Sequence, residues 1–523
     1  MKNNRTELSQ RVRYALLAGM AGAFLIPQVA FAAPTGENVV SGGAAISRSG
    51  NDTNISSSNT NNVIEWRDYS LASGERVVHD GGNKTNNYLN IVTGANTSNI
   101  NGKIEGGKDV YIVNPNGVIF GKSAEVNVGN LYVSTQEKST LNQANFTGSG
   151  ASPLVDTAPL KADVVNMGKI GASTVEVHGK HIRFLNAEDV ATTLNGTTRS
   201  PVTVYTDTPA TSLTTADGGY AHIGYRGSAP TNYTAGNATS ATPEYYKLVK
   251  NTTELSAISS AANLSGNYML EQDIDFANGS HTPIGTTTDP FTGKFDGNFF
   301  QIKNFEANDT HRAGLFGELS NARVENLGVT GASVIGGHPD SNYAGGIAAY
   351  ASGSLIKNVY VKDSEITSKK SDGTTGAGVV GGIVGAISSN TTIDSVYAKN
   401  RLGGNAGGIV GRTAVGATGM RISNAYNDSV PIIAPGTQTT FIYQVSQTLS
   451  PVLSIENSYN VGLNFSSNNT NLTGALSHVY ELDTATKKMR VVEPVTTPTT
   501  PTRFASTAAA TYAGWSINNT GEP

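Results

Sequence analysis

The chain contains no cysteine among its 523 residues, so no disulfide bond can stabilise its fold. Charged residues make up only 15% of the sequence and aromatic residues only 7%. Globular proteins average about 25% charged residues, so this composition is unlike that of an ordinary enzyme. Instead, 59 glycines accompany many Asn, Ser, Thr and β-branched residues. This composition favours many short β-strands joined by turns, and the regular recurrence of apolar residues argues against disorder.

Long hydrophobic runs are also missing, apart from one near the N-terminus at residues 14–26. This run follows a basic stretch and is shorter than the roughly 20 residues that a membrane-spanning helix needs. The small residues Ala30, Ala32 and Ala33 come soon after it. The pattern predicts a secretory signal peptide of residues 1–32, cleaved before Ala33. No later run is long enough to span a bilayer, so we expect no transmembrane segment in the mature chain.

Basic patches are scarce as well. The formal net charge is −4, and removal of residues 1–32, which carry a net charge of +3, lowers it to −7. No stripe of Lys and Arg is visible in the sequence. We therefore expect no nucleic-acid partner and no direct electrostatic attachment to anionic lipid.

The most informative stretch is residues 110–121, where an apolar β-type run breaks at a turn and then resumes. The turn consists of Asn114, Pro115, Asn116 and Gly117. Proline fixes φ near −65°, Asn tolerates left-handed geometry, and Gly accepts a positive φ without steric cost. The stretch therefore predicts two substantially buried strands joined by a tight corner.

Residues 33–135 surround this corner with further strand patterns. They are, in order, Val63–Tyr69, Leu89–Gly94, Ser98–Ile104 and Ala124–Thr135. In the last of these, apolar and polar residues alternate on both sides of Gly129. Such alternation predicts two short strands, each with one buried and one solvated face.

In this order and spacing, residues 33–135 resemble the secretion domain of two-partner-secreted exoproteins of the filamentous haemagglutinin type. The resemblance extends over an Ile-Asp-Trp-like strand, an Asn-Arg-Val-Thr-Gly-like turn, a Ser-x-Ile-x-Gly element, Asn-Pro-Asn-Gly and a closing Val-Ala-Ser-Thr. The chain departs from that pattern at Glu65, Ile91 and Tyr132, and it lacks the Asn-Pro-Asn-Leu site of some members. The resemblance implies export through the periplasm and a dedicated outer-membrane transporter that binds this domain while it is extended.

Residues 136–240 continue the strand–Gly–strand spacing. The strand patterns lie at Val164–Gly171, Val175–Val177 and Ile182–Phe184. A Thr-rich stretch at residues 187–218 is expected to form a loop or excursion, and residues 231–242 are expected to form a polar linker.

From residue 241 to residue 462 the sequence repeats itself. A Gly-apolar-apolar unit recurs as Gly314-Leu-Phe-Gly317, Gly346-Ile-Ala-Ala349, Gly382-Ile-Val-Gly385 and Gly408-Ile-Val-Gly411. An apolar-x-Asn element follows each unit and ends at Asn326, Asn358, Ser395 (in place of Asn) and Asn424, with a degenerate copy at Asn457. The first glycines lie 32, 36 and 26 residues apart. These units resemble the GLUG repeat of bacterial surface proteins.

A variable period around a fixed core predicts coils of a solenoid with loops of different length. We therefore expect an all-β chain wound as one continuous right-handed parallel β-helix, in which a secretion-domain cap precedes the repeat coils and stacked Asn residues pair their amides. A β-sandwich is the alternative, because short alternating strands also suit it. The expected divisions are a signal peptide (1–32), the secretion domain (33–135), a continuation (136–240), the repeats (241–462) and a C-terminal Thr/Pro-rich end (463–523).

Catalytic and metal-binding patterns are weak. Asp273 and Asp275 fall on one side of a strand, so calcium is conceivable, but a solvated strand face is the favoured interpretation. His178 and His181 show no metal spacing and no acidic partner in the sequence. No nucleophile elbow or phosphate loop is present. We expect no catalytic residue, no cofactor site and no metal site.

The pattern as a whole predicts a secreted or cell-surface adhesin that a pore partner exports. Its repeats would present an adhesive surface to a host receptor or glycan. Residues 114–117 would act as a corner of the first coils or as a direct contact for the transporter, and the sequence leaves both open. Asn-x-Ser/Thr sequons such as Asn96 allow glycosylation. The alternatives are a β-helical polysaccharide-active enzyme and a structural component of a biofilm or surface layer.

Overall fold

The computed structural model describes residues 34–186, 188–189, 203–204, 211–227, 229–309, 311–336, 343–368, 378–432, 440–444, 453–461, 476–477, 479–483 and 488–491. The chain divides into two compact units, an N-terminal unit, Leu25–Leu248, and a C-terminal unit that contains Val249–Pro523. The expected signal peptide with Ala30, Ala32 and Ala33 lies outside the described residues, as does most of 463–523. Within the described stretches, no helix has the length and apolar character needed to cross a membrane.

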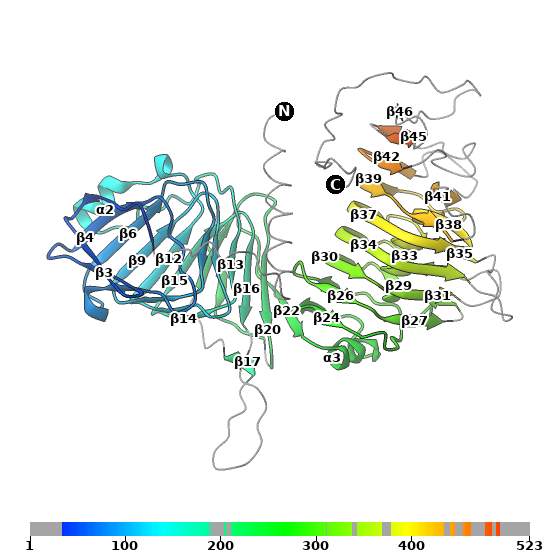
Figure 1. The fold of residues 1–523 in the computed structure, drawn as a ribbon, viewed down its shortest axis with the longest axis horizontal. Helices are drawn as coiled ribbons and strands as arrows, with labels where there is room; N and C mark the ends of the chain where they lie inside the picture. The colour runs from blue at the N-terminus through cyan, green and yellow to red at the C-terminus, as the bar shows by residue number, and fades with distance from the viewer. Residues whose placement is uncertain are drawn as a thin grey trace, which may run out of the picture. The chain divides into compact units, whose positions relative to one another are not determined.

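The N-terminal unit is a parallel β-helix whose coils pass through three sheets (Figure 1). Sheet I contains β1 (Asn38–Ser41), β4 (Asn61–Trp66), β6 (Asn87–Val92), β9 (Asp109–Val113), β12 (Asn130–Ser134), β15 (Val175–Gly179), β19 (Thr211–Thr215) and β21 (Tyr233–Ala235). Sheet II contains β2 (Ala45–Ser49), β3 (Asp52–Ser56), β5 (Arg76–His79), β8 (Lys103–Glu105), β11 (Glu125–Asn127) and β14 (Lys169–Gly171). Sheet III contains β7 (Ser98–Ile100), β10 (Val118–Phe120), β13 (Val164–Asn166), β16 (Ile182–Asn186), β20 (Ala221–Tyr225) and β22 (Glu244–Val249).

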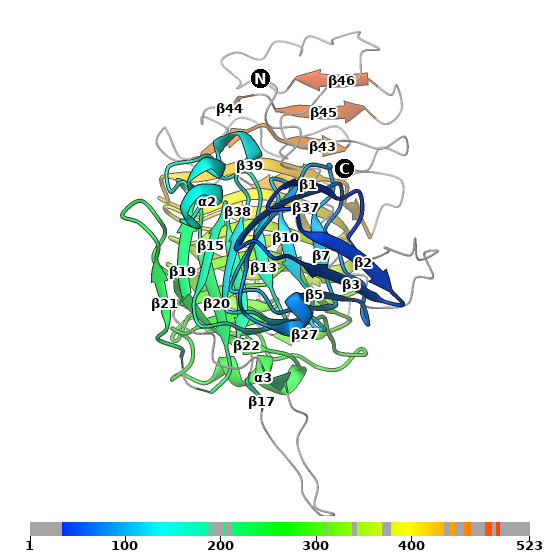
Figure 2. The same cartoon turned by 90° about the vertical axis from the view of Figure 1, so that its left-hand side faces the viewer.

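One coil runs from β9 through β10 and β11 to β12, and its strands pair in parallel with those of the coils on either side. Figure 2 shows this for β7, β10 and β13, which lie side by side. The first strands differ, because β1 pairs with β4 and β2 pairs with β3 in antiparallel fashion. The N-terminal edge of the stack is thus closed by antiparallel strands. A short antiparallel pair, β17 (Glu188–Asp189) and β18 (Thr203–Val204), lies apart from the three sheets.

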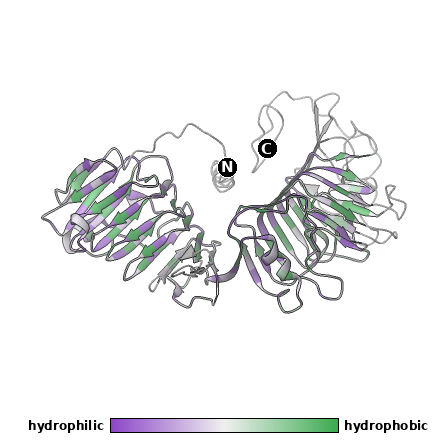
Figure 3. Cartoon of the chain, turned by 60° about the horizontal axis from the view of Figure 1, so that its bottom comes forward, coloured by the Kyte–Doolittle hydropathy of each residue, from purple (hydrophilic) through white to green (hydrophobic). Residues whose placement is uncertain are grey.

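Apolar residues alternate with polar ones along most strands, and Figure 3 shows this alternation as hydrophobic and hydrophilic bands. The inward residues form one core, which includes Ile64, Trp66, Val110, Ile112 and Val118. Each coil adds a few such side chains, and stacking buries them against the coils on either side. The core of the unit therefore grows coil by coil.

The outer face of sheet I is covered by residues 136–158, which we call the strap. It contains η2 (Lys138–Thr140) and the short helix α2 (Gln143–Ser149). Under the strap lies a second apolar cluster, which comprises Val63, Leu89, Ile91, Tyr111, Val113 and Phe146. Phe146 is fully buried, and its ring meets that of Tyr111 edge-on with centroids 5.5 Å apart. The strap explains why all five residues of β9 are buried, since both faces of this strand are covered.

The C-terminal unit begins with α3 (Thr252–Ser256) and η3 (Ala257–Ser259) and then forms two sheets. Sheet IV contains β23 (Asn267–Leu270), β24 (Ile274–Asp275), β25 (Lys294–Asp296), β26 (Gln301–Lys303), β27 (Glu306–Asp309), β30 (Arg323–Thr330), β31 (Ser333–Gly336), β34 (Leu355–Ser368), β37 (Thr392–Gly403), β39 (Met420–Asn427), β40 (Val430–Pro431), β42 (Leu453–Glu456), β43 (Tyr459–Val461), β44 (Leu476–Ser477), β45 (Tyr480–Asp483) and β46 (Lys488–Val491). Sheet V contains β28 (Arg312–Ala313), β29 (Phe316–Ser320), β32 (Tyr343–Gly345), β33 (Ala348–Ser352), β35 (Val379–Gly381), β36 (Val384–Ile387), β38 (Asn405–Thr413) and β41 (Thr440–Gln444).

Pairing within sheets IV and V is parallel, apart from the antiparallel pair of β45 and β46. Both units are therefore built from parallel coils, which confirms the expected β-helix and excludes a β-sandwich. Among the described residues, sheets I and II contain no strand after residue 235, and sheet V contains none before residue 312.

Two further expectations for the N-terminal unit need correction. Residues 231–242 are not merely a linker, because they contain β21, which pairs with β19. The Thr-rich stretch 187–218 is not only a loop or excursion. It contains the pair β17–β18 and also β19, which is a strand of sheet I. Its other described residues, 216–218, follow β19. Residues 187, 190–202 and 205–210 lie outside the described part of the chain. Threonine suits strands as well as loops, so composition alone misassigned this segment.

Candidate functional site

The Asn114–Gly117 corner joins β9 to β10, as the strand–corner–strand pattern predicts. The N–H of Gly117 donates to the carbonyl of Asn114 over 3.0 Å, which closes a reverse turn. Gly117 has φ of 103°, a conformation that side-chain-bearing residues rarely adopt. Pro115, which follows Asn114 directly, has no N–H to satisfy.

The side chain of Asn114 joins its own coil to the preceding one. It is fully buried, and its Nδ2 donates to the carbonyl of Asn96 and to Oγ of Ser98, each over 2.9 Å. The backbone N–H of Asn114 donates in the other direction, to the carbonyl of Ser134 in the next coil. Asn114 thus connects three successive coils.

Asn116 completes this connection. Its Nδ2 donates to the carbonyl of Gly94 over 2.9 Å, and its own carbonyl accepts a hydrogen bond from Oγ1 of Thr97 over 2.8 Å. Both Asn side chains of the corner are therefore engaged by the protein itself. In the folded state the corner holds coils together, so a partner that reads these side chains must do so before the coils close.

The four glycine-containing units of the repeat region lie in successive coils of the C-terminal unit. The residue after the first glycine of each unit is fully buried in the core. These residues are Leu315, Ile347, Ile383 and Ile409. Backbone hydrogen bonds of 2.8–3.0 Å connect these positions from coil to coil, from Phe316 to Ile347, from Ile347 to Ile383 and from Ile383 to Ile409. The sequence repeat is thus a spatial repeat.

The glycines of these units are required by close packing. A Cβ on Gly346 would lie 2.8 Å from the carbonyl oxygen of Gly382, and one on Gly382 would lie 2.0 Å from that of Gly408. A Cβ would also come within 2.6 Å of a neighbouring atom at Gly314, Gly317, Gly385, Gly408 and Gly411. None of these seven glycines has a positive φ. Their lack of a side chain allows backbones of adjacent coils to approach closely.

The apolar-x-Asn elements form a column of left-handed corners. The column consists of Asn326, Asn358, Ser395, Asn424 and Asn457, whose φ values are 54°, 54°, 57°, 52° and 47°. The amide of Asn358 donates to Oδ1 of Asn326 over 2.8 Å, which confirms the expected pairing of stacked amides. At Ser395 the column loses its amide, and Asn424 donates instead to the carboxylate of Asp394 over 2.7 Å.

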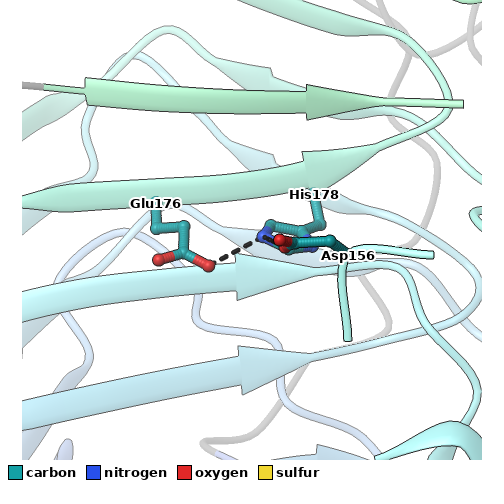
Figure 4. Close-up of side chains that lie close together, drawn as sticks. All are labelled: Asp156, Glu176 and His178. Atoms are coloured by element: carbon teal, nitrogen blue, oxygen red, sulfur yellow. Dashed lines mark hydrogen bonds and ion pairs between the residues drawn. The ribbon is translucent and has the colours of Figure 1, made fainter. Parts of the chain in front are cut away.

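Glu176, His178 and Asp156 converge on the outer side of sheet I (Figure 4). The first two alternate along β15 and so point to the same face, while Asp156 comes from the strap. Nε2 of His178 lies 2.7 Å from Oε1 of Glu176 and 3.9 Å from Oδ1 of Asp156. The expectation that His178 has no acidic partner is therefore wrong.

The contact with Gln136 determines which ring nitrogen of His178 carries the proton. The Gln136 amide is oriented by the strap backbone, since its Nε2 donates to the carbonyl of Val155 and its Oε1 accepts from the N–H of Val155. The same Nε2 lies 3.1 Å from Nδ1 of His178, so Nδ1 is the acceptor. The neutral ring then carries its proton on Nε2 and donates it to Glu176. A metal would need the lone pair of Nε2, so these residues fit a clamp that holds the strap and do not fit a metal site.

Asp273 and Asp275, the conceivable calcium ligands, are engaged by their own unit. Asp273 accepts a hydrogen bond from Lys303 Nζ over 2.8 Å. Asp275 accepts from the N–H of Ala277 and from the amide of Asn304, and these bonds hold the pKa of Asp275 below its usual value. These contacts fit the favoured interpretation of structural Asp residues on a strand and turn.

Sequence reasoning missed the strap and its clamp. Phe146 stands in a polar stretch with no helical periodicity, and Asp156 lies 22 residues before His178. The apolar residues of β9 on both faces were the one available signal, because a strand without alternation needs a cover on each side.

Comparison with known proteins gives a family match that covers the N-terminal unit and continues over residues 249–288 of the C-terminal unit. The family model of the TPS secretion domain, which is the domain of two-partner secretion, matches residues 30–288. The Heme/hemopexin-binding protein of Haemophilus influenzae strain Rd is 32% identical over 168 residues, which cover 31% of this chain and 18% of that protein. A second Heme/hemopexin-binding protein of Haemophilus influenzae is 32% identical over 80 residues, or 15% of this chain and 9% of that one. The chain thus spans less than a fifth of the length of these relatives.

Two solved structures are also similar in part. The secretion domain of HMW1 from Haemophilus influenzae aligns with a TM-score of 0.26 and 14% identity, covering 85% of this chain and all of that one. A putative immunoglobulin A1 protease from Bacteroides ovatus aligns with a TM-score of 0.33 and 19% identity, covering 46% of this chain and 84% of that one.

Proposed function

From the TPS secretion domain that this chain carries over residues 30–288, we propose that it is an adhesin-type exoprotein. Exoproteins with this domain are secreted across the outer membrane. Here an outer-membrane transporter would bind the N-terminal region while it is extended, and the coils would form outside the cell. The C-terminal unit, with its GLUG-like repeats, would present an adhesive surface to a host receptor or glycan at the cell surface or after release.

The observation that carries this proposal is the use of Asn114 and Asn116 by the folded corner. Their amides bind residues of the preceding coil and are no longer available once the coils have closed. Recognition of an extended chain followed by closure of the corner would make export and folding consecutive steps. Each added coil then buries apolar surface, which supplies a driving force outside the cell without a nucleotide.

Deletion of residues 42–135 tests the export step. We expect the truncated chain to remain in the periplasm, which fractionation and immunoblotting would show. The matched control removes one complete repeat, residues 346–381. This repeat begins at Gly346 and ends just before Gly382, the first glycine of the next repeat. This control should still reach the medium or cell surface. Normal secretion of the 42–135 deletion, with or without the control, would refute the proposed role of the N-terminal region.

Binding of haem or of a haem carrier is a second candidate, because the curated relatives are named for it. Their match to this chain covers at most 18% of their length, so we rank this function below adhesion. Addition of haemin with absorption spectroscopy, and capture of hemopexin, would test it. Adhesion would be tested in parallel by binding of the labelled protein to host cells, mucin and glycans.

We propose no catalytic activity for this chain. Release of reducing ends or unsaturated products from glycans by the purified protein would overturn this and favour a polysaccharide-active enzyme. Self-association without binding to cells or glycans would instead favour a structural component of a biofilm or surface layer.

A further inference from the structure

Two buried histidines occupy equivalent chemical settings, one in each unit. His79 ends β5 and is fully buried. Its Nδ1 lies 3.2 Å from the carbonyl oxygen of Glu105 in the next coil. A carbonyl only accepts hydrogen bonds, so Nδ1 carries the proton and Nε2 carries the lone pair. Nε2 is buried and has no hydrogen-bond partner.

His281 repeats this arrangement with the two ring nitrogens exchanged. It is 2% exposed, and its Nε2 lies 2.9 Å from the carbonyl oxygen of Leu315, the apolar residue of the first glycine unit. Nδ1 is buried and has no hydrogen-bond partner. The rings of Phe276 and Phe305 meet the imidazole edge-on, with centroids 5.4 and 5.3 Å away. Each histidine thus links two coils as a neutral imidazole.

We propose that His79 and His281 are acid-sensitive coil locks, which hold adjacent coils together when neutral and release them when protonated. A second proton would place an N–H⁺ where no acceptor is present and where the charge is out of contact with water. Burial of an unpaired charge strongly disfavours the folded state. This inference concerns the fold and stands independently of the proposed export and adhesion.

The groups that surround His79 give only partial compensation for a positive charge. The Asp80 carboxylate favours the charged ring, but its Oδ1 accepts a hydrogen bond from Tyr88, whose ring packs against His79 with centroids 4.5 Å apart. The Glu105 carboxylate faces Arg76 instead, at 3.5 Å. Burial lowers the pKa of His79, whereas the hydrogen bond to the Glu105 carbonyl and the charge of Asp80 raise it. The effect of burial is the largest, and the pKa falls to about 4.

The described contacts of His281 are with the two Phe rings and with the backbone carbonyls of Leu315 and Glu306, none of which carries a charge. Burial lowers the pKa of His281 in spite of the bond to the Leu315 carbonyl. A histidine whose pKa is lowered in the folded state contributes full stability above its unfolded pKa of about 6.5. That contribution is lost as the pH falls below this value toward the folded pKa.

The test measures urea unfolding of the mature chain at pH 7.5 and pH 5.0, with hydrogen exchange resolved by peptide so that each unit is followed separately. With a folded pKa of about 4, His79 alone should raise the unfolding equilibrium constant of the N-terminal unit about thirtyfold at pH 5.0. His79→Asn places an amide N–H near the position of Nδ1, and His281→Gln places one near the position of Nε2. Each variant should reduce the acid sensitivity of its own unit only.

His311→Gln is the matched control, because His311 is exposed, and it should leave both pH profiles unchanged. Equal pH profiles for the wild type and both lock variants would overturn the proposal. If a variant does not fold, selective NMR labelling of histidine in the wild-type chain decides the question. Lock imidazoles that stay neutral down to the acid unfolding transition support the proposal, whereas titration near pH 6.5 in the folded protein contradicts it.

Discussion

The two units build parallel coils with different corner chemistry. In the N-terminal unit, the strands of sheet I from β4 to β21 begin 26, 22, 21, 45, 36 and 22 residues apart, and the longest interval contains the strap. In the C-terminal unit, the first glycines of the repeats are 32, 36 and 26 residues apart. Among the described non-glycine residues with positive φ, Asp80 belongs to the N-terminal unit and the other thirteen to the C-terminal unit.

This difference shows two ways to turn a chain sharply without loss of stability. The N-terminal unit places Gly at left-handed corners and uses buried Asn114 to join coils. The C-terminal unit places Asn at left-handed corners, where the strain is modest for this residue and amide pairing offsets it. Its repeat-unit glycines, such as Gly382, lie where backbones nearly touch, while others, such as Gly331 and Gly416, also occupy left-handed corners. Loops of any length can then be inserted between these fixed points.

The largest expected effect is that of Gly382→Ala in the C-terminal unit. The new Cβ would lie 2.0 Å from the carbonyl oxygen of Gly408, and neither backbone can move without disturbing the stack. We expect a loss of more than about 4 kcal/mol in that unit alone, since such clashes belong to the most damaging substitutions. Hydrogen exchange of the two units would measure it.

Gly416→Ala is the control, because Gly416 has φ of 73° but no atom within 4 Å of the new Cβ. It should cost only about 1 kcal/mol, from the left-handed backbone. Similar losses for the two variants would show that close packing is not the reason for Gly382.

Phe146→Ala should have the next largest effect and should act on the N-terminal unit. Removal of a fully buried aromatic ring costs about 3 kcal/mol. The loss should appear first as faster hydrogen exchange in the strap and in β9, because the strap covers this strand. Phe146→Leu should retain most of the protection, and an unchanged strap in Phe146→Ala would contradict the covering role.

Asn114→Ala should destabilise the N-terminal unit by about 2 kcal/mol. It leaves the carbonyl of Asn96 and the hydroxyl of Ser98 without their buried donor. Chemical denaturation would measure the change. Asn83→Ala, at an exposed residue whose side chain donates to the carbonyl of Asp80, should stay within about 0.5 kcal/mol of the wild type. Equal effects would remove the reason to regard Asn114 as a connection between coils.

Ser395→Asn should give the smallest effect, a gain of about 0.5–1 kcal/mol in the C-terminal unit. Ser395 occupies a left-handed corner, with φ of 57°, in a column otherwise made of Asn. Asn tolerates this conformation better and would restore an amide beside Asn358. Thermal denaturation should show a higher melting temperature. A lower one would mean that the column has no room for the amide.

Much of the fold could be predicted because its signals are local. The apolar residues before and after Asn114–Gly117 predict β9 and β10, and the alternation around Gly129 predicts β11 and β12. The glycine units could be aligned by eye, and the structure places them in successive coils. In each case the residues that determine the element lie next to one another in the chain.

The features that the sequence did not predict depend on contacts between residues that are distant in the chain. Asn114 reaches Asn96 and Ser98 in the preceding coil, and His178 meets Asp156 from the strap. The division at residues 248/249 lies eight residues beyond the boundary predicted at 240/241, because it depends on where sheets I and II end. The polar stretch 231–242 indicated the approximate position of the boundary, but it also contains β21, a strand of sheet I.

The central claim is that the N-terminal unit carries the information for export. The most direct test expresses residues 1–248, and separately residues 249–523 behind residues 1–41, in a bacterium that contains the cognate outer-membrane transporter. The account predicts that residues 1–248 reach the medium as efficiently as the full chain, while residues 249–523 stay in the periplasm. Retention of residues 1–248 together with release of residues 249–523 would contradict it.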